Sequence, residues 1–254
     1  MGIIAPKNKA VTEYRGLHLY HFRHSNCSMR VRMTLEEKGL EWTSHHLNLH
    51  TGENVTPEYF GIHPKGLVPT LVHDGVVIIE STDIIDHLDR QFPDPPLKPP
   101  PDTGQADAVA RWMHTAADNH IHVKTYMFAH RLGDVMSKND TELAAYRELQ
   151  DNEELLQFHE ENSSPEGLSG ERVAGSTQVL LDCFAEIDRS LDGQAWLTGD
   201  AFTLADITWI PLHVSLDNAG FPFHRYANVA RWKDAVHARP SFERAVRDWI
   251  AGDG

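Results

Sequence analysis

The feature that most constrains the fold is a proline-rich stretch at residues 94–101, Asp-Pro-Pro-Leu-Lys-Pro-Pro-Pro. Proline lacks a backbone N–H and fixes its own φ, so this stretch cannot form a helix interior or a central strand. Before the stretch, strand and helix signals alternate, whereas after it only helix signals follow. We therefore predict a linker at residues 94–104 between two domains, at residues 17–93 and 105–254. Residues 1–16 are expected to be a frayed N-terminal extension.

The first domain is predicted to be a compact α/β unit with a mixed sheet. Asp74-Gly75 lies between two short apolar runs and is a strong signal for a two-residue hairpin turn. The elements expected are, in chain order, a strand at residues 17–22, a helix from about Cys27 or Ser28 to Lys38, a strand at 42–49, a short helix from Thr56, strands at 68–72 and 76–79, and a helix at 80–92.

The second domain is predicted to be helical throughout. Thr203 and Asp206 form a variant of the capping box that opens a buried helix. A polar, acid-rich insertion at residues 133–175 is expected to hold a helix near residues 142–158 and then a mobile loop. Further helices are expected at residues 106–130, 176–191, 229–238 and 241–250.

Composition excludes several classes of partner. The formal net charge is -14 and the pI about 5.6, which argues against binding to nucleic acid or to anionic membranes. No apolar run approaches the roughly 20 residues that span a bilayer, and residues 1–15 do not read as a signal peptide. Two cysteines give no disulfide framework, so a reducing cytoplasm is expected. Cys183, on an amphipathic pattern, is expected to be a buried small hydrophobe.

The stretch at residues 17–32 points to thiolate chemistry. It reads as a strand, a tight loop and a helix that starts close to Cys27. The free N–H groups of a first helical turn, together with the helix dipole, favour an anion at that place. A cysteine there should ionise more easily than a free thiol, so we predict a site that holds or activates a thiolate.

The chain contains 17 histidines, but they do not predict a metal site. His120 and His122 point to different faces of a helix and cannot chelate one ion together. The chain also lacks Cys-x-x-Cys and His-Glu-x-x-His patterns. His120 is interpreted as a wall of a substrate pocket or as a core residue.

Several segments, in this order and spacing, resemble those of cytosolic-type glutathione transferases over residues 17–250. The loop from Ser25 to Ser28, Ser-Asn-Cys-Ser, is similar to the zeta-type signature and to the loop of tetrachlorohydroquinone reductive dehalogenase. The resemblance implies a thioredoxin-like α/β N-terminal domain plus an all-α C-terminal domain. The other segments that carry it are Val68-Pro69-Thr70-Leu71, Glu80-Ser81, Thr203-Leu-Ala-Asp206 and Arg239-Pro-Ser-Phe-Glu-Arg.

The resemblance also implies a glutathione site on the first domain. Pro69 would follow a cis peptide bond and place the Val68 backbone against the cysteinyl amide of glutathione. Glu80 would pair with the γ-glutamyl ammonium, and Ser81 with the carboxylate. Lys65 stands near the position where many relatives bind the glycyl carboxylate, with Asn54 or His50 as alternatives.

Two residues of the loop are implied to be catalytic. Ser25 aligns with the hydroxyl that activates the glutathione sulfur in serine-type members. Cys27 could instead resolve a glutathionyl intermediate or act as a redox thiol, and the sequence leaves both open. Ser28 could be only the helix N-cap. Arg30 and Arg32 are expected to be structural, with Arg30 steadying the loop.

The function expected from this resemblance is activation of glutathione for attack on a small aromatic electrophile, by conjugation, reductive dehalogenation or aryl ether cleavage. The family resemblance also implies a homodimer. Two alternatives stay open. One is a glutathione-dependent cis–trans isomerase of the maleylacetoacetate type, against which the insertion counts. The other is a non-catalytic ligand-binding or interaction protein of the same fold.

Overall fold

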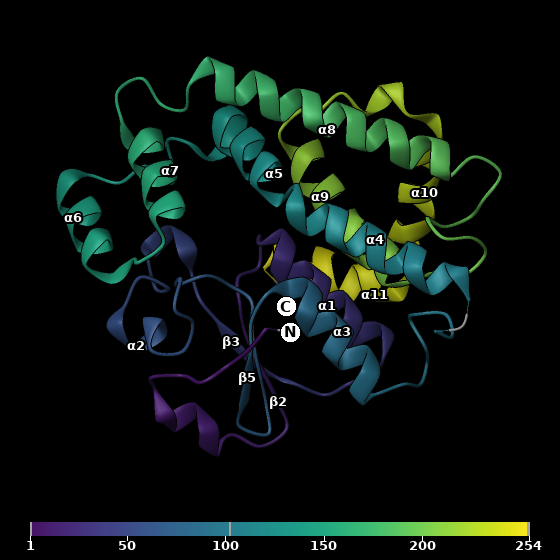
Figure 1. Cartoon of the computed structure of the whole chain (residues 1–254), viewed down its shortest axis with the longest axis horizontal. Coiled ribbons are helices and arrows are strands. Elements are labelled where there is room, and N and C mark those ends of the chain that lie inside the picture. The colour runs from purple at the N-terminus through teal and green to yellow at the C-terminus, as the bar shows by residue number, and fades with distance from the viewer. Residues whose placement is uncertain (1, 102, 253–254) are drawn as a thin grey trace.

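A computed structural model describes residues 2–101 and 103–252. The N-terminal domain holds a mixed sheet in the order β1-β5-β4-β2-β3. β2 and β3 are parallel, and the other neighbours are antiparallel. Figure 1 shows this domain below a layer of helices. The strands are β1 (Ile3–Ile4), β2 (Leu17–His21), β3 (Thr43–His46), β4 (Thr70–His73) and β5 (Val76–Ile78).

The two faces of the sheet are buried by different helices, because successive side chains of a strand point in opposite directions. Leu19 and Leu71 lie in one core cluster with residues of α1 (Asn26–Glu37) and α3 (Ser81–Gln91). Tyr20 and Val72, their neighbours in the chain, lie in a second cluster with Tyr59 of α2 (Pro57–Phe60). The first cluster continues into the C-terminal domain, so α1 and α3 form the layer between the sheet and the helical domain.

The N-terminal extension is ordered, and the expectation that it is frayed was wrong. β1 pairs antiparallel with β5, with Ile3 opposite Ile78. Val11, in a short 3-10 helix at Lys9–Glu13, is buried in the second core cluster. The extension therefore covers the edge of β5 and part of the sheet face, a role that its few apolar residues did not reveal.

The predicted hairpin is confirmed between β4 and β5. Asp74 and Gly75 both have positive φ, 50° and 83°, as a type I′ turn requires. A side chain at Gly75 would meet the Thr12 carbonyl oxygen, since a built Cβ lies 2.2 Å from it. Glycine is needed there for both conformation and space.

The C-terminal domain is helical, as predicted. The Thr203–Asp206 capping box opens α9, whose residues are almost all buried at the centre of the domain. None of the described helices is both long and apolar enough to cross a membrane. The helices are α4 (Gly104–Asp118), α5 (His120–Met127), α6 (Asp140–Leu149), α7 (Glu153–Ser163), α8 (Gly170–Ser190), α9 (Leu204–Asn218), α10 (Ala227–His237), α11 (Pro240–Phe242) and α12 (Asp248–Ala251), with π-helical turns at Phe128–Leu132 and Glu243–Arg247.

Two predicted helices are divided in the structure. The helix expected at residues 106–130 breaks at Asn119, which separates α4 from α5. The single helix expected near residues 142–158 is two helices, α6 and α7, because Asn152 caps a new helix by accepting a hydrogen bond from the Leu155 N–H. Figure 1 shows α6 and α7 projecting beside the N-terminal domain, above α2.

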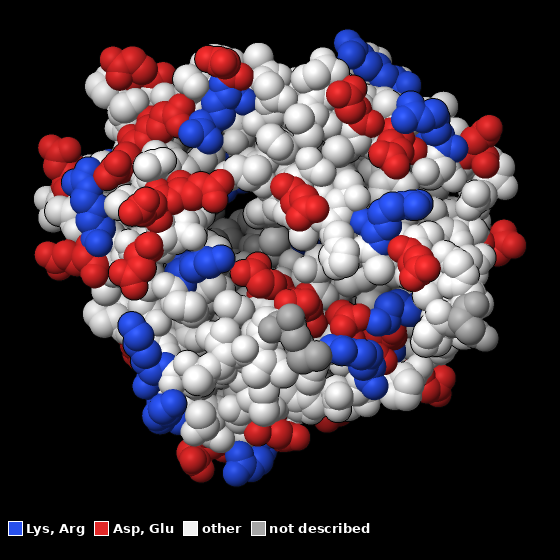
Figure 2. Space-filling view, viewed as in Figure 1, with Lys and Arg blue, Asp and Glu red and all other residues white. Residues whose placement is uncertain are grey.

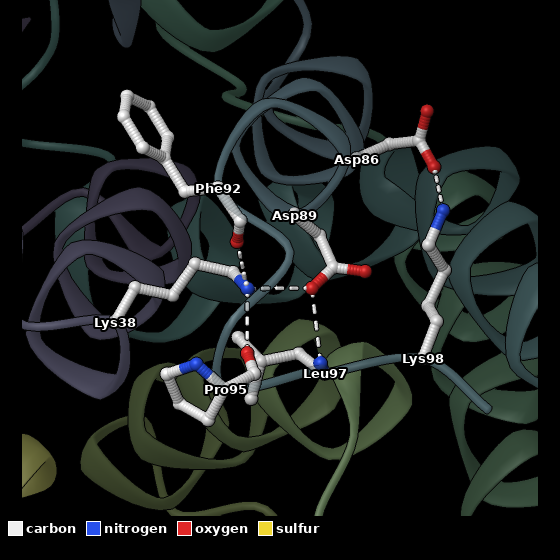
Figure 3. Close-up of polar contacts among 7 residues, drawn as sticks. All are labelled: Lys38, Asp86, Asp89, Phe92, Pro95, Leu97 and Lys98. Atoms are coloured by element: carbon white, nitrogen blue, oxygen red, sulfur yellow. Dashed lines mark hydrogen bonds and ion pairs between the residues drawn. The ribbon is translucent and has the colours of Figure 1, made fainter. Parts of the chain in front are cut away.

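The segment after α3 is attached to the first domain by one buried lysine (Figure 3). Lys38, at the C-terminal end of α1, donates to the backbone oxygens of Phe92 and Pro95 at 2.6 and 2.7 Å. Its ammonium also lies 2.8 Å from the carboxylate of Asp89, which accepts a further hydrogen bond from the Leu97 N–H. These contacts hold the start of the proline-rich stretch in place against the end of α1.

Candidate active site

The loop between β2 and α1 places Ser25 and Cys27 at the start of α1. Ser25 is the N-cap, and its Oγ accepts a hydrogen bond from the Ser28 N–H at 3.2 Å. The helix thus begins at Asn26, earlier than expected, and the cap is Ser25 rather than Ser28. Ser28 is buried instead, and its Oγ accepts from the Phe22 N–H. Cys27, which is partly exposed, lies in the first turn at the positive end of the helix dipole.

The Cys27 thiol faces a histidine from the other domain. Its Sγ lies 3.3 Å from Nε2 of His120. The long helix expected at residues 106–130 is interrupted at Asn119, so His120 is the first residue of α5. Its side chain faces the start of α1. Its ring nitrogen is also 3.1 Å from Oδ1 of Asn26. The sequence did not predict this pair, since the histidine belonged to a pattern that read as one continuous helix.

Arg30 ties the cysteine to the predicted glutathione residues. Its Nη1 donates to Oγ of Ser81 at 3.0 Å and lies 3.9 Å from Sγ of Cys27. Its Nε donates to the Thr208 carbonyl oxygen in α9. Nη2 is buried without a hydrogen-bond partner among the described residues. Arg30 therefore does more than steady the loop, because it brings a positive charge between Cys27 and the start of α3.

These neighbours decide the ionisation of Cys27. Burial by itself raises the pKa of the thiol, but the charges of His120 and Arg30 outweigh it. Hydrogen bonds from His120 and Ser81 act in the same direction, and together they lower the pKa of Cys27 to about 6. These neighbours therefore favour the thiolate form of Cys27.

Cys183 has the opposite character. Burial, Glu186 and Asp182 raise the pKa of its thiol to about 11. It is partly buried and packs against the main core cluster, so it stays protonated. Of the chain's two cysteines, only Cys27 lies where a reactive thiolate forms.

The other predicted residues lie on the turns before β4 and α3. The Val68–Pro69 peptide bond is cis, as the resemblance implied. Glu80 joins β5 to α3 with φ 64°, a conformation that costs a non-glycine residue energy and recurs at ligand-binding turns. Its side chain makes no capping hydrogen bond to α3. Ser81, the first residue of that helix, is nearly buried beside Arg30.

The three residues considered for the glycyl carboxylate, Lys65, Asn54 and His50, have different surroundings. The Lys65 ammonium lies 3.5 Å from the Glu80 carboxylate, and both side chains are about half exposed. The Asn54 amide donates to the Gly66 carbonyl oxygen at 2.7 Å, so it braces the same loop. His50 is one of the residues around a small pocket of about 320 Å³ beside the β2–α1 loop. The other lining residues are Phe22, Arg23, His24, His46 and Asn48.

These residues lie where the domains meet. Figure 2 shows a hollow in the surface of the molecule, with carboxylate side chains around its opening. In the same view, Figure 1 has α7 on one side of this place and α1 on the other. No group of three or more side chains suited to a metal ion occurs among residues 2–101 and 103–252.

The chain matches two family models, one for each domain. The model of the glutathione S-transferase N-terminal domain matches residues 19–96, and that of the C-terminal domain matches residues 170–235. The chain belongs to the glutathione S-transferase family. The predicted family, fold and enzyme class are therefore confirmed. His120, α6 and α7 fall between the two matched ranges, so the partner of Cys27 comes from the part of this transferase that the models leave out.

Individual relatives agree with this assignment. A zeta-class glutathione S-transferase of Euphorbia esula is 29% identical, over 91% of this chain and 90% of its own. Glutathione S-transferase TCHQD of Arabidopsis thaliana is 25% identical, over 93% and 91%. Among solved structures, β-etherase LigF from Sphingobium has a TM-score of 0.80 and 25% identity, over 90% of this chain and 98% of that one.

Replacing His120 by glutamine tests how the thiolate is stabilised. Loss of the imidazole should move the pKa of Cys27 from about 6 toward the value of an ordinary thiol. Because only the thiolate reacts with iodoacetamide, the alkylation rate at pH 6 should fall at least about 5-fold. Peptide mass spectrometry across a pH series measures this, with Cys183 as the internal unreactive thiol. An unchanged profile would show that His120 does not control Cys27.

Proposed function

We propose that this glutathione S-transferase binds glutathione along the edge formed by the start of α1, the turn before β4 and the start of α3. It directs the activated thiol at a small aromatic electrophile held in the hollow between the domains. The observation that carries the proposal is the Cys27–His120 contact, 3.3 Å across the domain junction. The contact supports the proposal, because a thiolate of Cys27 would face both a molecule bound to the first domain and the helical domain.

Glutathione binding is proposed to use the residues that the resemblance singled out. The Val68 backbone before the cis bond would pair with the cysteinyl amide. Ser81 and the first N–H groups of α3 would take the γ-glutamyl carboxylate. Glu80, with no bond to its own helix, is available for the ammonium group. Lys65 lies beside Glu80 and is proposed for the glycyl carboxylate, which it would reach by leaving that ion pair.

Conjugation needs only one displacement. The glutathione thiolate forms a bond to the electrophilic carbon, and the halide or aryloxide leaves with its bonding electrons. The Ser25 Oγ accepts a hydrogen bond from the Ser28 N–H, so its own proton is free to donate to the glutathione sulfur. Such a donor stabilises the thiolate and lowers its pKa.

Reductive removal adds a second step that uses Cys27. The Cys27 thiolate attacks the glutathione sulfur of the adduct and forms a mixed disulfide. The bond between sulfur and carbon breaks, and the carbon keeps the electron pair and takes a proton, which requires a carbanion that the substrate stabilises. A second glutathione then attacks the mixed disulfide, so that oxidised glutathione leaves and the Cys27 thiolate returns. The likeness to a β-etherase supports ether substrates in this scheme.

Turnover with glutathione tests the proposal. We expect release of halide or phenol from aryl halides or aryl ethers, with products identified by mass spectrometry. Activity only on a dicarboxylate diketone would instead favour the isomerase alternative. Glutathione binding without turnover of any of these would favour the non-catalytic alternative.

Replacing Glu80 by glutamine should weaken glutathione binding. The charge attraction to the γ-glutamyl ammonium is lost, but the carboxylate is about half exposed, so the effect is moderate. We expect the KM for glutathione to rise about 5-fold to 10-fold with little change in kcat. Glu58→Gln removes the same charge from an exposed position on α2 and should leave the KM unchanged. Equal KM values for the two variants would contradict the proposed role of Glu80.

The homodimer, carried over from the family, and the cytoplasmic location, expected from the cysteine content, are also proposals. Sedimentation equilibrium tests the first. A single species with the 28.7 kDa mass of one chain would contradict it.

A further inference from the structure

Lys124 lies on the same helical face as the residue that contacts Cys27. It follows His120 by four residues in α5, and residues at that spacing stand one above the other on a helix. One turn of helix is about 5.4 Å long. Since His120 contacts the thiol, the side chain of Lys124 begins one turn further along α5 on the face that meets Cys27.

The amine of Lys124 is enclosed by rings rather than by carboxylates. Its Nζ lies 4.2 Å from the centre of the Phe158 ring and 5.4 Å from that of Phe128. Its hydrogen-bond partner is Nε2 of His159, at 3.3 Å. No ion pair to Lys124 occurs among the described residues, so the groups in direct contact with its amine are aromatic faces and one imidazole.

A second lysine joins this cluster. Lys138 lies with its Nζ 5.4 Å from the ring centre of Tyr146, whose ring is also 5.4 Å from that of His159. Burial and the charge of Lys138 lower the pKa of Lys124 to about 7, although Glu154 opposes this. Burial also lowers the pKa of Lys138, against the effect of Glu142. The two amines thus belong to one aromatic cluster, and neither forms an ion pair with a carboxylate among the described residues.

The cluster is attached to the glutathione side of the hollow. Gln150, at the end of α6, donates to the Lys65 carbonyl oxygen at 3.0 Å and to the Tyr146 hydroxyl at 2.9 Å. The insertion therefore reaches from the aromatic enclosure of Lys124 to the loop that carries Lys65. The carboxylates around the opening in Figure 2 are on the surface, where water and salt screen them over about 8 Å, whereas the enclosed amines are screened much less.

We propose that Lys124 and Lys138 form an anion-binding subsite at the far end of the electrophile pocket, which selects aromatic electrophiles that carry a carboxylate or phenolate opposite the leaving group. The rings around the amines are buried and keep water away from them. The anionic group of such a substrate supplies the negative partner that the two ammonium groups lack. The inference rests on the proposed function, because it names the substrate class of the same site.

Two matched compounds test the subsite, 4-chloro-3-nitrobenzoate and its neutral amide. Calorimetric binding without glutathione is measured first, so that the result does not depend on catalysis. The wild-type protein should bind the benzoate more tightly than the amide. Lys124→Met should weaken benzoate binding about 10-fold to 100-fold and change amide binding less than about 2-fold. Lys124→Arg, which keeps the charge, should retain most of the preference.

The control is Lys7→Met, which removes one positive charge from an exposed position in the N-terminal extension, far from Lys124 in the sequence. It should leave both affinities unchanged. Equal binding of the two compounds by the wild-type protein, equal losses of both in Lys124→Met, or no benzoate binding at millimolar concentration would each overturn the subsite. Lack of turnover with glutathione, alongside an intact preference in binding, would contradict the proposed function but not the subsite.

Discussion

Replacing Cys27 by serine is expected to abolish reductive turnover while the protein still binds glutathione. A serine hydroxyl does not ionise near neutral pH and cannot form the mixed disulfide that the second step requires. We expect kcat for reductive dehalogenation or reductive ether cleavage to fall by at least about 1,000-fold. Steady-state rates and the yield of oxidised glutathione measure the loss. Simple conjugation should be affected less, because its displacement step does not consume the Cys27 thiolate.

The matched control is Cys183→Ser, which removes the other thiol from a position that plays no part in the site. It should keep the wild-type rate. If Cys27→Ser also kept the wild-type reductive rate, Cys27 would have no catalytic role, and activation would rest on Ser25 alone. A Ser25→Ala variant would then be the one expected to lose activity.

Replacing Lys38 by methionine is expected to cause the largest loss of stability. The side chain is fully buried, and its ammonium satisfies Asp89 and two backbone oxygens at once. Removing it leaves the Asp89 carboxylate buried with only the Leu97 N–H. Breaking a buried ion pair in this way costs about 3–5 kcal/mol. For a chain of this size the midpoint of thermal unfolding should fall by roughly 10 °C, as calorimetry would measure.

Lys98→Met is the control for this prediction. Lys98 pairs with Asp86 in the same segment (Figure 3), but both side chains are partly exposed. An exposed pair contributes less than about 1 kcal/mol, so the midpoint should barely change. Equal losses in the two variants would show that burial of Lys38 is not what anchors the segment after α3.

The parts of the fold that the sequence predicted well are those with strong local signals. The two-residue turn needs positive φ at both central residues, and only a few residue types tolerate that conformation. Asp74-Gly75 therefore marked the hairpin. The Thr203–Asp206 capping box satisfies its own helix end and therefore marks the start of α9. Ile3 and Val11 carry no such signal. Ile3 belongs to the fold because β5 offers an unpaired edge, and Val11 because one face of the sheet offers an apolar surface. Both are properties of the sheet rather than of the N-terminal extension.

The site was predicted only where a family motif or a helix start marked it. Cys27 stood out because its place at a helix start makes a thiolate favourable. Its pKa is indeed lowered, but the lowering comes from His120, Arg30 and Ser81, which the helix start did not reveal. His120 could not be assigned, since its role depends on a break at Asn119 and on contact between two domains. Lys124 had no signal either, because two members of its enclosure, Phe158 and His159, come from α7, which lies more than twenty residues further along the chain.

A calorimetric titration with reduced glutathione near neutral pH tests the central claim most directly. The proposed site predicts saturable binding with one glutathione per chain, weakened in Glu80→Gln and retained in Cys27→Ser. No heat of binding at millimolar glutathione would contradict the proposal.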